Sequence, residues 1–373
     1  MFLKNIKAKN FKNFKELDVE FNSLNLLVGA NASGKSNFIQ LFKFLKDLSQ
    51  VGINNALSLQ GDIEFFKNIG NDDNQTEIYY HFISHSKDSD FKELIYHIQF
   101  YYDSKINLQF EKVLLTSNNN KYELLNQNCK LSYQSKLTDE KFPKELISKK
   151  INKGNCLAQI LVDVFDIDIF KSKIYDFDVK KAKLPSTIND LIEIKENGSN
   201  LSIVLRHLFK NENHKNTFIN LVQQALPFIK DVNIENYFNE NLVINLQESY
   251  YKDIFLPSTI LSDGTIVVFC LVIAMFFDES KIKIFEEPER ALHPYLISRV
   301  VSLFYDSSRE NQIFLTTHNP EMLKCVKLED IYLISRNENG FSSIKKINEL
   351  DNAKVFLQND LGIDEIISSS LLD

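Results

Sequence analysis

The sequence predicts an α/β fold, and three observations along the chain support this prediction. The apolar segment 24–28 is followed by a glycine-containing loop at 29–36 and by apolar residues at helical spacing over 37–45. Residues 77–115 contain three segments in which apolar and polar residues alternate, separated by polar turns, as in antiparallel strands. In the last third of the chain, helix and strand patterns alternate, as in a doubly wound sheet.

The other elements follow from the same patterns. Alternating residues predict strands, apolar residues at spacings of three and four predict helices, and the turn at 197–200 marks a helix start. The predicted strands are 2–8, 17–21, 24–28, 77–83, 94–102, 106–115, 241–247, 281–287 and 311–318. The predicted helices are 37–45, 201–208, 216–227, 266–277 and 295–306, with further Lys- and Glu-rich helical stretches between 117 and 200.

Three segments are expected from this order of elements. An N-terminal lobe over 1–116 carries the glycine loop and the antiparallel strands, and a mainly helical subdomain covers 117–255. A C-terminal lobe over 256–373 carries the remaining motifs. The basic clusters at 149–150 and 180–183 are better explained as solvated helix faces than as nucleic-acid contacts.

The composition is typical of a folded protein, and its negative net charge does not favour a protein specialised for binding polyanions such as nucleic acids. Hydrophobic residues make up 44% and charged residues 25% of the 373 residues, and the net charge is −7. The four cysteines show no C-x-x-C spacing, which indicates reduced thiols and a cytoplasmic location. The longest apolar run, 266–277, is too short to span a bilayer, so no membrane association is expected.

Residues 29–36 read Gly-Ala-Asn-Ala-Ser-Gly-Lys-Ser, the complete G-x-x-x-x-G-K-S pattern of a phosphate-binding loop (P-loop) between a strand and a helix. Its glycines allow a tight turn with N–H groups facing phosphate oxygens, and the helix start adds a positive dipole end. We expect Lys35 to reach the β- and γ-phosphates of ATP and Ser36 to hold Mg²⁺. The predicted nucleotide-binding residues here are Gly29, Ala30, Asn31, Ala32, Ser33, Gly34, Lys35, Ser36 and Asn37.

Further candidate site residues follow in a fixed order in the last third. Leu261–Thr265 places short polar residues and a glycine at the start of an apolar helix, which favours anion binding. The next predicted strand ends in Glu286, which can organise Mg²⁺, and Glu287, which can orient or deprotonate an attacking water. His318 ends another strand, where its imidazole can reach a γ-phosphate. Each feature alone also fits a structural role, whereas their combination after a complete P-loop predicts nucleotide hydrolysis.

This motif set resembles the ABC-type ATPase heads of the RecF, SMC and overcoming-lysogenization-defect class. More narrowly, it is similar to the stand-alone bacterial AAA ATPases of abortive-infection modules and to retron- and Septu-associated ATPases. The segments that carry the resemblance are 10–14, 29–37, 197–201, 261–265, 286–294 and 316–320. It implies a P-loop NTPase head with a mixed central sheet, an antiparallel β subdomain and a helical subdomain that carries the signature segment, Leu261–Thr265.

The resemblance also implies how the site is completed. One subunit supplies the P-loop, Glu286, Glu287 and His318, and the other supplies Ser262 and Gly264 to the same γ-phosphate. Two ATP molecules then lie in a head-to-tail homodimer. In this scheme Glu287 is the general base, Glu286 organises Mg²⁺, and His318 senses the γ-phosphate.

Three positions depart from the usual pattern of such heads, and one residue of that pattern is not placed. The metal-organising acid is Glu286 where most of these ATPases have Asp, His293 stands where many carry Asp, and Lys12 stands where relatives often carry Arg. The glutamine that usually contacts Mg²⁺ and water is not placed, and Gln75 and Gln109 are candidates for it.

Several hypotheses describe the biological role of this ATPase. The leading one is an ATPase that senses an invader in a bacterial anti-phage system and controls a partner effector, such as a nuclease or toxin. No nuclease domain is expected within these 373 residues. The alternatives are a RecF-like DNA-repair ATPase, for which DNA is the partner, and an ATP-gated clamp with little turnover. A transporter subunit is the least favoured.

Overall fold

The computed structural model describes most of the chain, and its elements fall into two units. The described residues are 1–349 except 62, 85, 87–89, 104, 118–119, 128–129, 136–142, 153–154, 166, 168–170, 189–190, 238–240 and 252. Of these described residues, the first unit contains those within 1–23, 27–172 and 332–349, and the second contains those within 24–26 and 173–331. The strand β3 (Leu24–Val28) therefore contributes to both.

The first unit is built on a seven-stranded antiparallel sheet, as the alternating segments predicted. Its strand order is β2-β1-β4-β5-β6-β7-β8. The bounds are β1 Phe2–Phe11, β2 Phe14–Glu20, β4 Gln75–Ile83, β5 Phe91–Tyr102, β6 Ile106–Ser117, β7 Lys121–Gln127 and β8 Lys130–Ser135. In β4 and β5 every second side chain is buried, which gives the sheet one apolar face.

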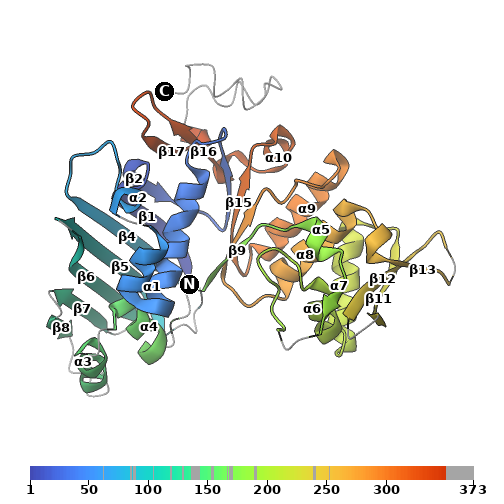
Figure 1. Ribbon diagram of the computed structural model, residues 1–373, viewed down its shortest axis with the longest axis horizontal. Coiled ribbons are helices and arrows are strands. Elements are labelled where there is room, and N and C mark those ends of the chain that lie inside the picture. Colours follow the sequence, from blue (N-terminus) through green and yellow to red (C-terminus); the bar gives the residue numbers. More distant parts are fainter. Residues whose placement is uncertain are drawn as a thin grey trace. The chain divides into compact units, whose positions relative to one another are not determined.

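Helices cover that apolar face. Figure 1 shows α1 (Lys35–Leu59) lying across the sheet, and the Tyr80 hydroxyl of β4 donates to the Leu41 carbonyl of this helix at 2.8 Å. α1 is interrupted at Gly52, whose φ of 78° lies in the left-handed region that favours glycine. The smaller helices of this unit are α2 Ile63–Phe66, α3 Lys144–Asn152 and α4 Leu157–Phe165. β3 also has β16 (Ile331–Arg336) as a neighbouring strand, and β17 (Ser342–Lys346) lies beyond β16, in the order β17-β16-β3.

The second unit has a sheet in the order β3-β15-β14-β9, in which β14 and β15 are parallel. The bounds are β9 Ser172–Tyr175, β14 Ile282–Glu286 and β15 Gln312–Thr317. Two contacts between buried aromatic rings pack its helices: the ring centroids of Phe285 on β14 and Phe304 on α9 are 5.0 Å apart, and those of Phe218 on α7 and Phe269 on α8 are 5.4 Å apart. The helices are α5 Val179–Ala182, α6 Leu201–Leu208, α7 Glu212–Ala225, α8 Asp263–Phe276, α9 Pro294–Ser307 and α10 Pro320–Cys325.

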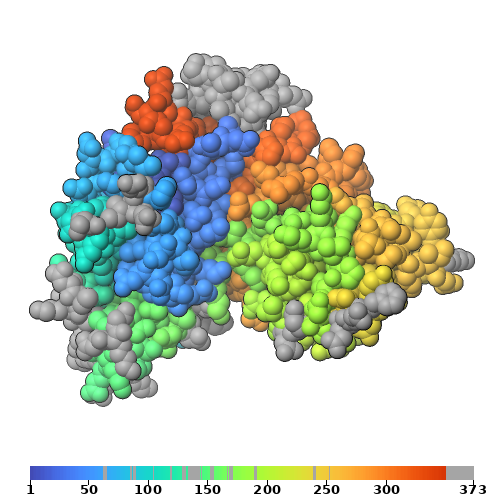
Figure 2. Space-filling view, in the orientation of Figure 1, coloured from blue at the N-terminus to red at the C-terminus, as the bar shows by residue number. Residues whose placement is uncertain are grey.

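A smaller antiparallel sheet completes the second unit. It pairs β10 (Ser186–Thr187), β12 (Asn241–Glu248) and β11 (Ile229–Tyr237), with β13 (Phe255–Pro257) on β12. In the space-filling view of Figure 2, the green surface of residues near 173–225 continues into the yellow surface of this sheet region. No described helix combines the length and the apolar character that crossing a membrane requires.

The main difference from the sequence prediction lies in residues 117–255. They were expected to be mainly helical, but they contain β7 and β8, which extend the large sheet, and the strands β9 to β12. In β7 the buried positions are Tyr122, Leu124 and Asn126, so a polar residue takes one place of the apolar alternation. Asn126 is buried because its amide donates to Glu111 at 3.3 Å, a contact that the local sequence does not reveal.

Candidate active site

The P-loop connects β3 to α1 in a conformation that two left-handed residues make possible. Ala32 has φ of 63° and Gly34 has φ of 120°. α1 begins at Lys35 directly after the loop, so its first backbone N–H groups have no preceding helical carbonyls to bind. The Lys35 ammonium group donates to the carbonyls of Gly29 at 2.5 Å and Ala30 at 2.9 Å. Lys35 thus lies inside the loop, where a phosphate group would be bound.

Two side chains from distant segments of the chain support the P-loop through hydrogen bonds. The Ser342 hydroxyl, at the start of β17, donates to the Ser33 carbonyl at 2.5 Å and accepts a hydrogen bond from the Asn13 side-chain amide. A Cβ atom at Gly34 would lie 2.5 Å from Asn13 Nδ2 and 2.6 Å from Ser342 Oγ. Position 34 therefore requires glycine both for its backbone angle and for the close approach of this bracket, formed by Asn13 and Ser342.

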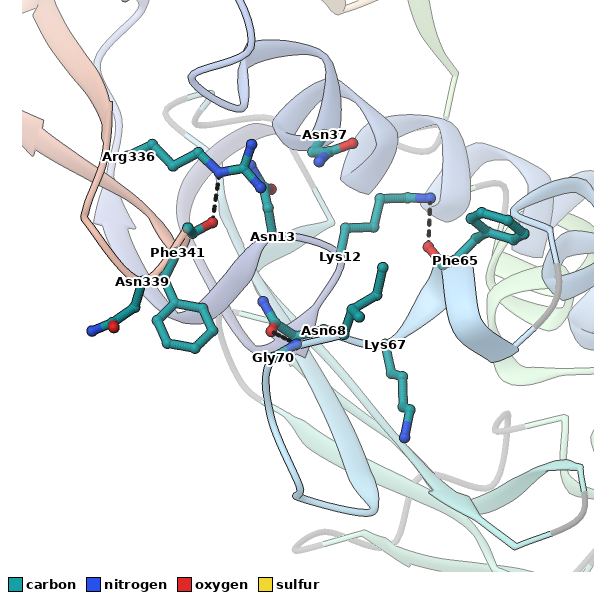
Figure 3. A pocket seen from close by; sticks show the side chains of 12 residues that line it. Lys12, Asn13, Asn37, Phe65, Lys67, Asn68, Gly70, Arg336, Asn339 and Phe341 are labelled. Carbon is teal, nitrogen blue, oxygen red and sulfur yellow. Dashed lines mark hydrogen bonds between the residues drawn. The ribbon is translucent and has the colours of Figure 1, made fainter.

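A pocket of about 320 Å³ opens beside the P-loop helix, entirely within the first unit (Figure 3). Its walls combine apolar rings, amides and cations, and the close-up shows the β16–β17 turn facing the 65–70 segment. The Lys12 ammonium group donates to the Phe65 carbonyl at 3.1 Å, and burial lowers the Lys12 pKa. The lining residues are Lys12, Asn13, Asn37, Phe65, Lys67, Asn68, Ile69, Gly70, Arg336, Asn339, Gly340 and Phe341.

The second unit holds the predicted carboxylates and histidine at the carboxyl ends of β14 and β15. Glu286 ends β14 and pairs with Thr316 in the parallel register, and Glu287 follows with φ of 44°. His318 Nδ1 lies 2.8 Å from Glu287 Oε1, so the structure brings these two predicted residues together. Burial alone would raise the Glu287 pKa, but the hydrogen bond from Arg290 and the charge of His318 outweigh it, and the pKa lies below its ordinary value.

A buried hydrogen-bonded pair fixes the turn after Glu287. Glu289 is 4% exposed, and its Oε1 accepts from the Thr317 hydroxyl, while Thr317 Oγ1 also accepts from the Asn319 backbone at 2.9 Å. Burial raises the Glu289 pKa above its ordinary value. This contact joins the turn that carries Glu287 to the end of β15 that carries His318, so the two side chains are held by a common support.

The signature segment is built as a capped helix start. Ser262 is exposed, and its hydroxyl accepts from the Thr265 backbone at 3.1 Å as the N-cap of α8. A Cβ atom at Gly264 would lie 3.2 Å from the Ala291 carbonyl. The Lys183 ammonium group donates to Asp263 at 2.5 Å and to the Leu261 carbonyl at 2.6 Å. The predicted solvated basic cluster thus includes one lysine that fastens the signature segment.

The sequence did not indicate three further contributors to these groups. Asp176 and Ser342 lie outside the motifs, Arg290 lies within 286–294 without an assigned role there, and each acts through a contact with a distant or neighbouring segment. Of the glutamine candidates, Gln75 lies in β4 and accepts from Gln99 at 2.8 Å, and Gln109 lies in β6. The small cavity beside Glu286 and Glu287 is lined by Asp176 from the end of β9 and by Arg290.

The donor types present suit a magnesium-bound nucleotide. Ser36 is exposed at the first turn of α1, and Glu286 lines the small cavity at the end of β14. Both supply hard oxygen ligands, which Mg²⁺ prefers, and Mg²⁺ sites of this kind use few protein ligands together with substrate phosphates. The P-loop belongs to the first unit and the carboxylates belong to the second. Within its own unit, the P-loop has donors suited to phosphate, and the carboxylates have oxygens suited to Mg²⁺.

Comparison with known proteins shows both local and fold-level similarity. Short stretches match curated proteins described as "DNA replication and repair protein RecF": 48% identity over 46 residues for Oenococcus oeni and 49% over 41 residues for Clostridium kluyveri. These matches cover 12% and 11% of this chain and the same shares of the relatives, so they span only about one eighth of those proteins.

Solved structures of SMC heads share the fold over nearly the whole chain. An SMC head bound to the C-winged helix domain of ScpA has a TM-score of 0.57 at 18% identity, covering 92% of this chain and 98% of that one. A second SMC head with an extended coiled coil, bound to the C-terminal domain of ScpA derived from Pyrococcus furiosus, has a TM-score of 0.52 at 16% identity, covering 96% and 99%. The predicted ABC-ATPase head fold is thereby confirmed.

A family model matches residues 24–324, which include the P-loop, the signature segment, Glu286, Glu287 and His318. Its description is "AAA domain, putative AbiEii toxin, Type IV TA system". The match covers well over half of the chain, and the fold and the motif geometry agree with it. The chain therefore belongs to this AAA-domain family of P-loop ATPases.

Proposed function

We propose that this protein binds and hydrolyses ATP with Mg²⁺ at the interface of a head-to-tail homodimer. The observation that carries the proposal is the Glu287–His318 pair at the ends of two parallel strands, in a chain with a complete P-loop. Lys35 and the N–H groups of the P-loop bind the phosphates, and Ser36 and Glu286 hold or organise Mg²⁺, which neutralises charge on the transferred phosphoryl group. Glu287 takes a proton from the attacking water, and His318 orients Glu287 and contacts the γ-phosphate.

The partner subunit completes the pocket in this proposal. Ser262 and Gly264 of the signature segment lie at the N-terminus of the 14-residue helix α8, whose dipole end favours a phosphate. Ser262 is exposed, as an interaction with a nucleotide on another copy requires.

We further propose that the ATPase acts as the sensor or regulatory subunit of an anti-phage, abortive-infection system that controls an effector such as a nuclease or toxin. The family description, which names an AbiEii toxin, supports this role. The short RecF matches favour a second candidate, a DNA-repair ATPase. DNA-stimulated hydrolysis that falls steeply with salt would favour this second function.

Two substitutions test the chemistry. Lys35→Ala removes the cation within the loop and is expected to lose ATP affinity, whereas Glu287→Gln is expected to bind ATP but to hydrolyse it about 10²–10⁴-fold more slowly. ATP binding by calorimetry and phosphate release are measured beside Lys43→Ala, a lysine on the same helix α1 outside the loop. Unchanged ATP affinity in Lys35→Ala, or unchanged hydrolysis in Glu287→Gln, would contradict the proposed site.

The defence role is tested in cells that carry the gene with its neighbours. Plaque formation is compared for the wild type and Glu287→Gln after phage challenge. Loss of protection in the variant is expected, and equal protection would rule out a role driven by ATP hydrolysis.

A further inference from the structure

Both oxygens of the Glu287 carboxylate already have partners in this structure. Oε1 is 2.8 Å from His318 Nδ1, and Oε2 accepts from Arg290 Nε at 3.2 Å and Nη2 at 3.1 Å. A carboxylate that accepts a proton from water must turn an oxygen lone pair to that water. The contact with His318 on one oxygen and the hydrogen bonds from the Arg290 guanidinium on the other hold the carboxylate where it is and oppose this step.

Arg290 also binds a second carboxylate. Its Nη1 donates to Asp176 Oδ1 at 3.2 Å, at the end of β9 and 114 residues away in the sequence. The side chains of Arg290 and Asp176 are 59% and 57% exposed, whereas that of Glu287 is 23% exposed. The guanidinium group therefore bridges a shielded carboxylate and an exposed one, and it can move without disturbing the buried core.

We propose that Arg290 is a gating residue that restrains Glu287, and that transfer of the Arg290 guanidinium to Asp176 alone releases Glu287 for hydrolysis. This inference rests on the proposed ATPase function and adds a regulatory step to the same site. The restrained state is the one seen here, with Arg290 shared between Glu287 and Asp176. Asp176 competes for the guanidinium group and so favours release.

None of the other charged groups described near Glu287 takes over the contact of Arg290 with Oε2. Glu286 precedes Glu287 on β14, and Glu289 is buried with its Oε1 accepting from the Thr317 hydroxyl. His318 contacts only Oε1. Among the described residues, Arg290 supplies every cationic hydrogen bond to Glu287 Oε2.

The gating role predicts that substitutions of Arg290 and of Asp176 change the rate of hydrolysis in opposite directions. Arg290→Ala is expected to raise the single-turnover rate of ATP hydrolysis about twofold to fivefold, the range set by a partly exposed ion pair, with little change in KM. Asp176→Asn removes the competing carboxylate and is expected to lower this rate by a similar factor. The double variant Asp176→Asn/Arg290→Ala is expected to match Arg290→Ala, because Asp176 acts only through Arg290.

Two controls separate gating from simple structural support. Arg290→Lys keeps the charge but not the two-nitrogen contact with Oε2, and it is expected to restore only part of the restraint. Arg309→Ala removes an exposed arginine that pairs with Asp306 on its own helix segment, and it should leave the rate unchanged. Thermal unfolding of every variant shows whether it is folded.

The outcomes are distinguishable. A fall in rate in both Arg290→Ala and Asp176→Asn would mean that Arg290 merely positions Glu287, and it would overturn the gating proposal. If Arg290→Ala does not fold, an unchanged or higher rate in Asp176→Asn overturns it equally. Hydrolysis that is insensitive to Glu287→Gln would instead contradict the proposed function itself, whatever Arg290 does.

Discussion

Ser342 shows how one residue can support a phosphate site without touching phosphate. It is 3% exposed, and its hydroxyl serves the Ser33 carbonyl and the Asn13 amide at once. Loss of the hydroxyl leaves buried polar groups without their partner, at a cost of about 1–3 kcal/mol. These polar groups are the Ser33 carbonyl and the Asn13 amide, next to Gly34. Losing the hydroxyl therefore destabilises the conformation of the P-loop.

We therefore expect Ser342→Ala to weaken ATP binding by about tenfold while the protein stays folded, because about 1.4 kcal/mol changes an affinity by that factor. Ser342→Thr keeps the hydroxyl and should retain more affinity. The matched control is Ser343→Ala, whose hydroxyl lies 3.4 Å from that of Ser335 on the neighbouring strand. Titration with a fluorescent ATP analogue measures the effect, and equal affinities for the two alanine variants would refute the bracket.

At the scale of elements, helix α8 links the signature segment to a buried lysine. The helix begins at the Ser262 cap, and its interior is buried and apolar. Past its other end, the Lys283 ammonium group on β14 donates to the carbonyls of Met275 at 2.8 Å and Asp278 at 2.7 Å. Burial lowers the Lys283 pKa from its ordinary value to about 8.

This pKa gives stability a pH dependence with a definite sign. Below pH 8 both the folded and unfolded states hold the proton, and the buried charge costs about 3 kcal/mol. Between pH 8 and the ordinary lysine pKa of about 10.5, the unfolded state binds more protons, so the free energy of unfolding rises with pH. Lys283→Met should lack this rise.

Denaturant unfolding of the wild type and Lys283→Met at pH 7, 8.5 and 10 measures the difference. The wild type is expected to gain about 2–3 kcal/mol relative to the variant across this range. Parallel pH profiles would show that Lys283 does not titrate in this window.

The elements also show where sequence patterns suffice. The strands 24–28, 77–83 and 106–115 and the helix 201–208 follow from apolar periodicity, and the structure confirms them with small changes at their ends. β7 was missed because buried Asn126 interrupts its apolar alternation, and what allows this burial is Glu111 on the adjacent strand. A partner across a sheet is invisible to a local pattern.

At the scale of the whole molecule, the proposed dimer is an equilibrium that ATP shifts. A nucleotide that bridges two copies binds the dimer more tightly than the monomer, so saturation with it favours the dimer. Glu287→Gln retains the nucleotide in the proposed scheme and should accumulate as a dimer with ATP and Mg²⁺. Lys35→Ala, which is expected to lose the nucleotide, should not.

Analytical ultracentrifugation of both variants, with and without ATP and Mg²⁺, measures this shift. An ATP-dependent dimer of Glu287→Gln alone is the expected result. A monomer at saturating ATP would contradict the shared site, whereas a stable dimer with very slow turnover in the wild type would favour the ATP-gated clamp.

Local patterns in the chain suffice to predict the P-loop, the capped start of the signature segment, the strand before the two carboxylates and the histidine beside the end of β15. These features are contiguous, because turn geometry, helix capping and strand burial depend on neighbouring residues. Folding, by contrast, brings Ser342 to Ser33 across 309 residues and Asp176 to Arg290 across 114, and neither contact can be predicted from the chain. Strand pairing brings such residues together, and contacts between distant segments leave no periodic mark on the chain.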